Sequence, residues 1–217
     1  MNITVEKTME MPDVVLFARK LDAALKAEHK KRKEFYSMIE DERKMEFING
    51  EIYFQSPAKF RHTEAVGNLV LLMRAFVINK KLGIVGSEKM LISLTRNDYE
   101  PDICFFEADK AKNFRPDQMQ FPTPDLVVEV LSESTRRHDR KIKFDDYAAH
   151  GVKEYWIVDP KSETVEQYEL DGEDYRLLLN SADGSIESPV ISGFSIPVKA
   201  IFREKDNLDT LRKILSD

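Results

Sequence analysis

A glutamate inside an otherwise apolar run is the feature that most restricts how this chain can fold. Residues 125–132 read Asp-Leu-Val-Val-Glu-Val-Leu-Ser, so Glu129 has apolar neighbours on both sides. Such a run is typical of a central strand that is buried on both faces of a sheet. An ionised carboxylate without a partner costs several kcal/mol there. Glu129 therefore requires a compensating positive charge, either a lysine or arginine side chain or a divalent metal ion.

The segments around this strand alternate between helical and extended patterns. Apolar residues at intervals of three and four predict an N-terminal helical arm over residues 12–44 and helices over 62–80, 136–150 and 206–216. Gly83 is expected to end the second of these helices. Patterns of period two predict a strand over 154–159 and three hairpins, over 46–55 around Asn49-Gly50, over 87–107 with a turn at 96–99, and over 164–179 around Asp171-Gly172. Residues 110–124 are expected to form a loop, and the order of elements predicts an α/β fold with a mixed sheet flanked by helices.

The composition excludes several classes of protein. The 217 residues are 42% hydrophobic, which is enough to bury a core at this length and argues against overall disorder. Cys104 is the single cysteine, so an intramolecular disulfide is excluded and a reducing compartment is expected. Apolar runs are short, and residues 1–11 have no apolar signal core, so we expect a cytoplasmic protein without a membrane span. The net charge of −6 disfavours a general nucleic-acid coat protein but leaves room for an enzyme with a locally basic groove.

Asp102 is a second carboxylate that could meet Glu129. It follows Pro101 at the start of the predicted strand 101–107, on the face of Cys104 and Phe106. If this strand neighbours the 125–132 strand, Asp102 and Glu129 can bind one ion, because two carboxylates with waters and a substrate phosphate are the usual magnesium ligands. Two alternatives remain open: Glu129 could form a structural salt bridge, and Pro-Asp is also a common turn signal.

A basic segment follows the carboxylate strand directly. The predicted helix over 136–150 would bring Lys143 back over the strand, with Asp139 and Tyr147 on the same helix face. Two carboxylates and a lysine beside a basic rim are the groups that metal-assisted hydrolysis of a phosphodiester requires. A solvated basic face is the alternative for the rim, which comprises Arg136, Arg137, Arg140 and Lys141.

The chain resembles the Uma-type restriction endonucleases, which belong to the PD-(D/E)XK nuclease superfamily. The resemblance covers about residues 33–180 and rests on residues 46–51, Ser56-Pro57, His62, Gly83, Pro101-Asp102 and above all on the run from Pro124 to Pro160. It implies a restriction-endonuclease-like mixed β-sheet core that uses magnesium, or manganese in its place, to cut DNA. We assign this nuclease domain to residues 45–200, preceded by the arm at 1–44 and followed by a tail helix at 201–217.

The resemblance also implies roles for individual residues. Asp102 and Glu129 would be the metal ligands. The superfamily places its lysine two residues after the glutamate, where this chain has Leu131. In the Uma-type proteins the lysine lies on the following helix, which matches Lys143, with Lys141 as the competing candidate.

Two further residues match family positions and are candidate catalytic residues. His62 would lie at the start of the helix over 62–80, where helix packing is the alternative explanation. Glu46 could complete the metal shell or act through a water molecule, and a salt bridge at the strand edge is the equal alternative.

These observations leave three hypotheses for function. The first is a magnesium-dependent endonuclease that binds DNA through the basic rim. The second is an inactive protein of nuclease fold that binds nucleic acid or a protein partner, because fold alone does not establish activity. The third is a structural protein in which Asp102, Glu129 and Lys143 form only a buried ion-pair network. A homodimer is compatible with each hypothesis.

Overall fold

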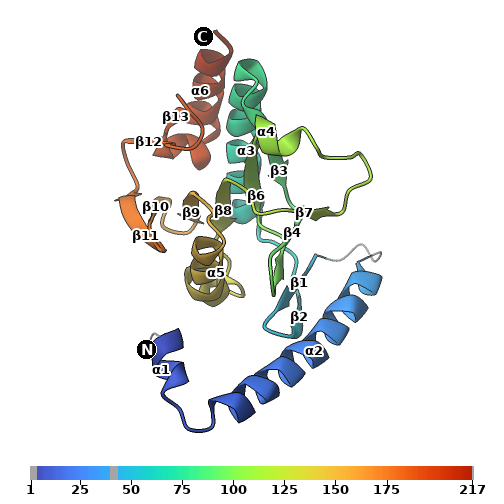
Figure 1. Cartoon of the computed structure of the whole chain (residues 1–217). Coiled ribbons are helices and arrows are strands. Elements are labelled where there is room, and N and C mark those ends of the chain that lie inside the picture. The colour runs from blue at the N-terminus through green and yellow to red at the C-terminus, as the bar shows by residue number, and fades with distance from the viewer. Residues whose placement is uncertain (1–3, 40–43, 217) are drawn as a thin grey trace.

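A six-stranded mixed sheet forms the centre of the protein in the computed structural model, which describes residues 4–39 and 44–216 (Figure 1). Its strand order is β11-β10-β9-β8-β6-β3. The strands are β3 (Gly83–Ser87), β6 (Ile103–Glu107), β8 (Leu126–Val130), β9 (Glu154–Asp159), β10 (Thr164–Asp171) and β11 (Asp174–Ser181). Strands β8 and β9 run parallel, and the other neighbours run antiparallel. Every residue of β8 is buried, as the apolar run predicts.

Helices cover both faces of this sheet. On one face lie α3 (Phe60–Lys80), α6 (Glu204–Ser216) and the 3₁₀ helix η2 (Val198–Ile201), with α3 and α6 side by side in Figure 1. Val128 and Val130 of β8 point into this layer. Val127 and Leu131 pack on the opposite face, which α5 (Lys143–Ala149) covers with Tyr147. Because side chains alternate along a strand, Glu129 points toward α5.

A second, five-stranded sheet has the order β2-β1-β5-β4-β7. Its strands are β1 (Met45–Ile48), β2 (Glu51–Phe54), β4 (Leu91–Ser93), β5 (Asp98–Tyr99) and β7 (Gln120–Phe121). The predicted β1–β2 hairpin is confirmed, and both turn residues, Asn49 (φ 52°) and Gly50 (φ 84°), have the positive φ that a tight hairpin turn requires. The remaining short elements are α4 (Ala108–Ala111), β12 (Ser185–Glu187) and β13 (Ser195–Pro197).

Several predicted boundaries were wrong. The segment 87–94 is not one strand, because Glu88 adopts a left-handed conformation (φ 55°) and sends β3 and β4 into different sheets. The expected turn at 96–99 contains β5, and the expected loop at 110–124 contains β7. Helix α3 ends at Lys81 (φ 56°), whereas Gly83 begins β3 at a point where a Cβ atom would overlap the carbonyl oxygen of Phe106. The expected helix at 136–150 is confirmed to within one residue, and it contains the π-helical turn η1 (His138–Ile142).

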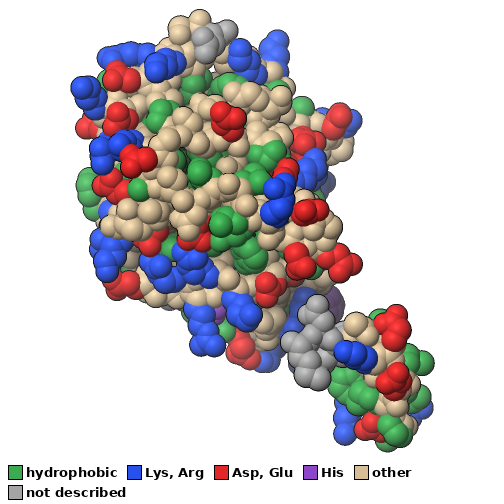
Figure 2. Space-filling model, turned by 90° about the vertical axis from the view of Figure 1, so that its left-hand side faces the viewer, with side chains coloured by type: hydrophobic (Ala, Val, Ile, Leu, Met, Phe, Trp, Pro, Cys, Tyr) green, Lys and Arg blue, Asp and Glu red, His purple; other side chains and the backbone are tan. Residues whose placement is uncertain are grey.

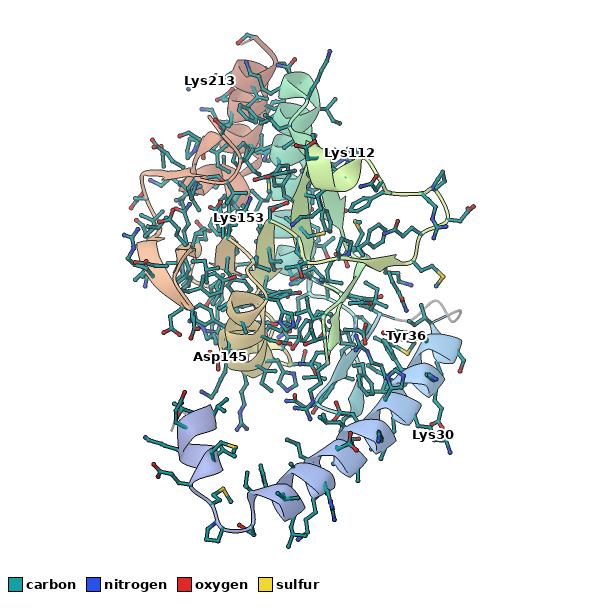
Figure 3. All side chains as sticks on the ribbon, viewed as in Figure 1. Lys30, Tyr36, Lys112, Asp145, Lys153 and Lys213 are labelled. Atoms are coloured by element: carbon teal, nitrogen blue, oxygen red, sulfur yellow. The ribbon has the colours of Figure 1, made fainter. Side chains whose placement is uncertain are left out.

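The N-terminal arm consists of α1 (Val5–Met9) and the long helix α2 (Val14–Met38). Residues 40–43 of the predicted arm lie outside the described residues. The C-terminal half of α2 docks on the second sheet: Phe35 is fully buried, and Tyr36 donates a hydrogen bond to Asp98 (2.9 Å). In Figure 3, Tyr36 lies on the side of α2 that faces the domain, and Lys30 points away from it. Across residues 4–39 and 44–216, no helix is both long and apolar enough to span a membrane.

Arg32 holds the arm to the domain through a buried carboxylate. Its Nε and Nη2 atoms donate to the two oxygens of Asp98 (2.6 and 2.9 Å), a residue with no exposed surface. We predict that Arg32→Met lowers the free energy of unfolding by about 3–5 kcal/mol, because it leaves Asp98 buried without its cation. Urea unfolding followed by the fluorescence of Trp156 measures the loss.

The matched control is Lys31→Met. Lys31 pairs with Glu51 (2.9 Å) on the surface, so its removal should cost less than about 1 kcal/mol. Equal losses in the two variants would contradict the anchoring role of Arg32.

Candidate active site

Strand register brings the two predicted metal ligands together. Strands β6 and β8 pair antiparallel with Ile103 opposite Val128, so the next position along places Asp102 opposite Glu129. Residues opposite each other in such a pair point to the same side of the sheet. Asp102 and Glu129 both line one pocket of about 280 Å³, and His62 and Lys143 line the same pocket.

Asp102 is held in its charged form. Asp102 is buried, and burial opposes ionisation. Three contacts outweigh this effect, namely those with His62 Nε2 (3.5 Å), the Lys44 ammonium (3.0 Å) and the backbone N–H of Val130 (2.8 Å). Together they hold the pKa of Asp102 below its usual range. Asp102 is therefore a fixed negative charge in the pocket lining.

Lys143 is enclosed by three carboxylates. Its Nζ atom lies 2.8 Å from Glu46, 3.1 Å from Glu129 and 3.3 Å from Asp139, and the side chain is 1% exposed. The π-helical turn before α5 carries Asp139 one turn upstream of Lys143. Burial alone would lower the pKa of Lys143, but the three carboxylates raise it well above the usual value. Lys143 is therefore a fixed positive charge.

One ammonium cannot neutralise three buried carboxylates. Burial, only partly offset by Lys143 and reinforced by the neighbouring carboxylates, raises the pKa of Glu129 well above the usual value. Burial also raises the pKa of Asp139. Without an added cation, burial therefore favours the protonated forms of the Glu129 and Asp139 carboxyl groups.

Glu46 and His62 occupy different places relative to the pocket. His62, in the first turn of α3, faces Asp102 from the pocket lining, and its Nδ1 atom has no hydrogen-bond partner among the described residues. Glu46 is 2% exposed and is absent from the part of the pocket lining that the structure describes. It contacts Lys143 and accepts a hydrogen bond from the backbone N–H of Glu100 (3.0 Å). Glu46 therefore contacts Lys143 from outside the described pocket lining.

Sequence reasoning missed two residues at Asp102. Lys44 Nζ lies 3.0 Å from Asp102 and 3.7 Å from Glu88. Potential ligand atoms of His62, Glu88 and Asp102 all lie within 4.8 Å of one another. Lys44 immediately precedes β1 and Glu88 forms the turn after β3, so neither belongs to a periodic pattern that could have indicated it.

The predicted basic rim is only partly at the pocket. Arg136 lines it and pairs with Asp159 (2.8 Å), whereas Arg137 and Lys141 are exposed outside its described lining. The guanidinium of Arg140 makes two hydrogen bonds with Glu166 (2.9 and 2.5 Å). Three basic residues that the sequence reasoning did not single out also line the pocket, namely Lys59, Arg61 and Lys161.

Comparisons with known proteins agree with this architecture. A crystal structure of "a putative nuclease belonging to DUF820" from Anabaena variabilis superposes with a TM-score of 0.63 at 18% identity, covering 73% of this chain and 89% of that one. This chain therefore shares the fold of that structure. Residues 32–199 match the profile of the family described as "Uma2: Putative restriction endonuclease". The chain belongs to the Uma2 family, as its sequence motifs predict.

Two relatives from Synechocystis sp. are described as uncharacterized proteins. Protein sll1609 is 31% identical over 137 residues, which is 62% of this chain and 77% of the relative. Protein slr1290 is 30% identical over 164 residues, covering 74% of this chain and 84% of the relative. The family match begins at residue 32, so α1 and the first part of α2 precede it.

The carboxylate cage around Lys143 has a measurable consequence for stability. We predict that Lys143→Met lowers the free energy of unfolding by about 3–5 kcal/mol in chelator at neutral pH, because it leaves Glu46, Glu129 and Asp139 without their shared cation. The control is Lys141→Met, two residues earlier and exposed, which should change stability by less than about 0.5 kcal/mol. Urea unfolding of both variants measures the difference. A similar loss of stability in the two variants would contradict the stabilising role of the contacts around Lys143.

Proposed function

We propose that this protein is a metal-dependent endonuclease that hydrolyses phosphodiester bonds of DNA. The observation that carries the proposal is the meeting of Asp102, Glu129 and Lys143 in one pocket, from three separate segments of the chain. Membership of a family described as restriction endonucleases supports the same reaction. A cytoplasmic location and a homodimeric assembly complete the proposal.

The donor set suits a divalent cation. Asp102 and Glu129 would hold Mg²⁺, with Mn²⁺ as a substitute, because hard cations take carboxylate oxygens. The contacts around Asp102 and Lys143 join more carboxylates than ammonium groups: the carboxylates are Glu46, Asp102, Glu129 and Asp139, and the ammonium groups are Lys44 and Lys143. One divalent ion supplies the missing charge. When bound, it would polarise the phosphate and activate water.

Lys143 stabilises the charge that develops on the phosphate. Its ammonium lines the pocket beside Glu129 and is held in place from behind by Glu46 and Asp139. Fixed charges of this kind need no reorganisation during the reaction. Glu46 and Asp139 are therefore positioning residues for Lys143, and His62 orients Asp102 from the opposite side.

An alternative ligand set uses the same aspartate. His62, Glu88 and Asp102 form a cluster that includes an imidazole nitrogen, which suits Mn²⁺ better than Mg²⁺. The two sets share Asp102 and differ in the second carboxylate. That carboxylate is the half-exposed Glu88 in one set and the buried Glu129 in the other. The burial of Glu129 favours the first set, because a buried carboxylate has the larger need of a cation.

DNA is proposed to approach over the basic pocket lining. Lys59, Arg61, Arg136 and Lys161 surround the pocket mouth, and Arg137 and Lys141 extend this surface outward. Arg140 contributes least, since Glu166 already neutralises it. Phosphate contacts of these groups would hold the duplex despite the net charge of −6.

A cleavage assay tests the catalytic proposal. Purified protein should nick supercoiled plasmid with Mg²⁺ or Mn²⁺ and lose activity in chelator, and Glu129→Gln should lower the rate at least 100-fold. Burial favours the neutral form of Glu129, so the glutamine variant should fold as stably as the parent. Its loss of activity would then reflect the missing ligand charge.

Two further variants sharpen the assay. Lys143→Met should abolish cleavage under conditions in which circular dichroism shows it folded, and Lys141→Met should cut at nearly the parental rate. Cleavage by Glu129→Gln at the parental rate would place the activity elsewhere. A parent that binds DNA but never cuts it would favour the inactive, DNA-binding hypothesis. A parallel assay on RNA establishes the choice of substrate.

The proposed DNA surface predicts a specific dependence on salt. The double variant Arg61→Gln/Lys161→Gln should bind a short duplex more weakly, and the slope of log K against log salt should fall by about 0.9 for each phosphate that the variant no longer neutralises. Arg140→Gln is the control and should leave the slope unchanged, because its guanidinium is occupied by Glu166. Fluorescence anisotropy from about 50 to 200 mM salt measures both. If Arg140→Gln lowered the slope and the double variant did not, the DNA surface would lie on the other side of η1.

A further inference from the structure

The N-terminal half of the arm presents an apolar row to solvent. Figure 2 shows the arm standing away from the rest of the molecule, with hydrophobic side chains among charged ones. Phe17, Leu21 and Leu25 are 43%, 49% and 43% exposed. They are spaced four residues apart, so they lie along one face of α2. Large apolar side chains gathered on one projecting face are a typical sign of an interaction surface.

This row continues the face that already binds the domain. Further along the same helix face lie Glu28, which pairs with Arg96, and then Arg32 and Phe35, which dock on the second sheet. The docked part holds α2 in a fixed direction, while residues 14–25 pass beyond the domain. Helical segments of this length gain little stability in water without tertiary packing. We therefore expect another protein surface to cover this apolar row.

A second apolar pair in the arm matches this row. In α1, Val5 and Met9 are 75% and 65% exposed and are also four residues apart. Their spacing equals that of Leu21 and Leu25, so an antiparallel α1 from another copy can place Met9 against Leu21 and Val5 against Leu25. The two apolar pairs are then buried together.

The charges of the arm favour the same arrangement. Residues 4–13 carry Glu6, Glu10 and Asp13 against Lys7, a net charge of −2. Residues 14–26 carry Arg19, Lys20 and Lys26 against Asp22, a net charge of +2. Antiparallel pairing sets the acidic part of one copy against the basic part of the other, twice by symmetry. Because residues 4–26 are neutral as a whole, nucleic acid and anionic membranes have little attraction for this part of the arm.

We propose that the arm is a dimerisation element in which α1 of one copy packs antiparallel on the N-terminal half of α2 of a second copy. The interface buries Val5 and Met9 against Leu25 and Leu21 and pairs residues 4–13 with residues 14–26. It lies outside the pocket residues and forms without metal or DNA, so it stands independently of the nuclease activity.

Sedimentation equilibrium of the full chain, in chelator and without DNA, tests the proposal. The parent should be a dimer, and Leu21→Asp/Leu25→Asp should be monomeric with an unchanged core by circular dichroism. The matched control is Leu71→Asp/Ile78→Asp, which alters two exposed apolar residues of α3 (46% and 65%) and should remain dimeric. A monomeric parent, or a Leu21→Asp/Leu25→Asp variant that still dimerises, would overturn the proposal.

A charge exchange tests the antiparallel orientation. Glu6→Lys/Glu10→Lys alone and Arg19→Glu/Lys20→Glu alone should each raise the dimer dissociation constant at least tenfold at low salt, because each places like charges face to face. An equimolar mixture of the two variants should recover parental affinity as a heterodimer. If neither variant alone weakens the dimer, the pairing is not antiparallel.

Discussion

An ionised carboxylate that is buried in a sheet needs a positive charge or hydrogen-bond donors beside it, and this constraint organises the centre of the protein. Glu129 is buried within β8, and the pairing of β8 with β6 places Asp102 opposite it. Helix α5 then brings Lys143 over both strands, where Glu46 and Asp139 also contact it. The two faces of β8 thus have different roles: Val128 and Val130 pack in the core under α3, and the face toward α5 carries the charged groups. The same residues that make this face costly to bury make it suitable for a cation and a phosphate.

Much of this arrangement could be predicted from the sequence, because the signals are local. The apolar run around Glu129 identified a central strand, Asn49-Gly50 identified a hairpin, and the family motifs indicated Asp102 and Lys143. Lys44 and Glu88 could not be found in this way, since they approach Asp102 from irregular segments whose path depends on tertiary contacts. The break between β3 and β4 was missed for a related reason: Glu88 has positive φ, and no residue type there signalled a turn. Arg140 looked like a rim residue because the sequence could not show that Glu166 lies across from it.

The arm and the core are under separate constraints. The core is formed by the packing of α3, α5 and α6 on the sheet. Of these elements, α6 lies outside the segment that matches the Uma2 family, and the others lie within it. The arm lies mostly before that segment and is attached by the buried pair of Arg32 and Asp98, with Phe35 and Tyr36 beside it and the Glu28–Arg96 and Lys31–Glu51 pairs nearby. One anchored helix can thus carry an association surface away from the pocket without altering the residues that form it.

The central claim is that Asp102 and Glu129 share one divalent cation. The most direct measurement is a crystal structure of the full chain soaked in Mn²⁺, with the ion located by its anomalous scattering. The account predicts a single manganese in the pocket, bound by one oxygen of Asp102 and one of Glu129, and the same soak of Glu129→Gln should show no ion there. A manganese held by His62, Glu88 and Asp102 without Glu129, or no ion in the pocket of the parent at saturating concentration, would contradict the account.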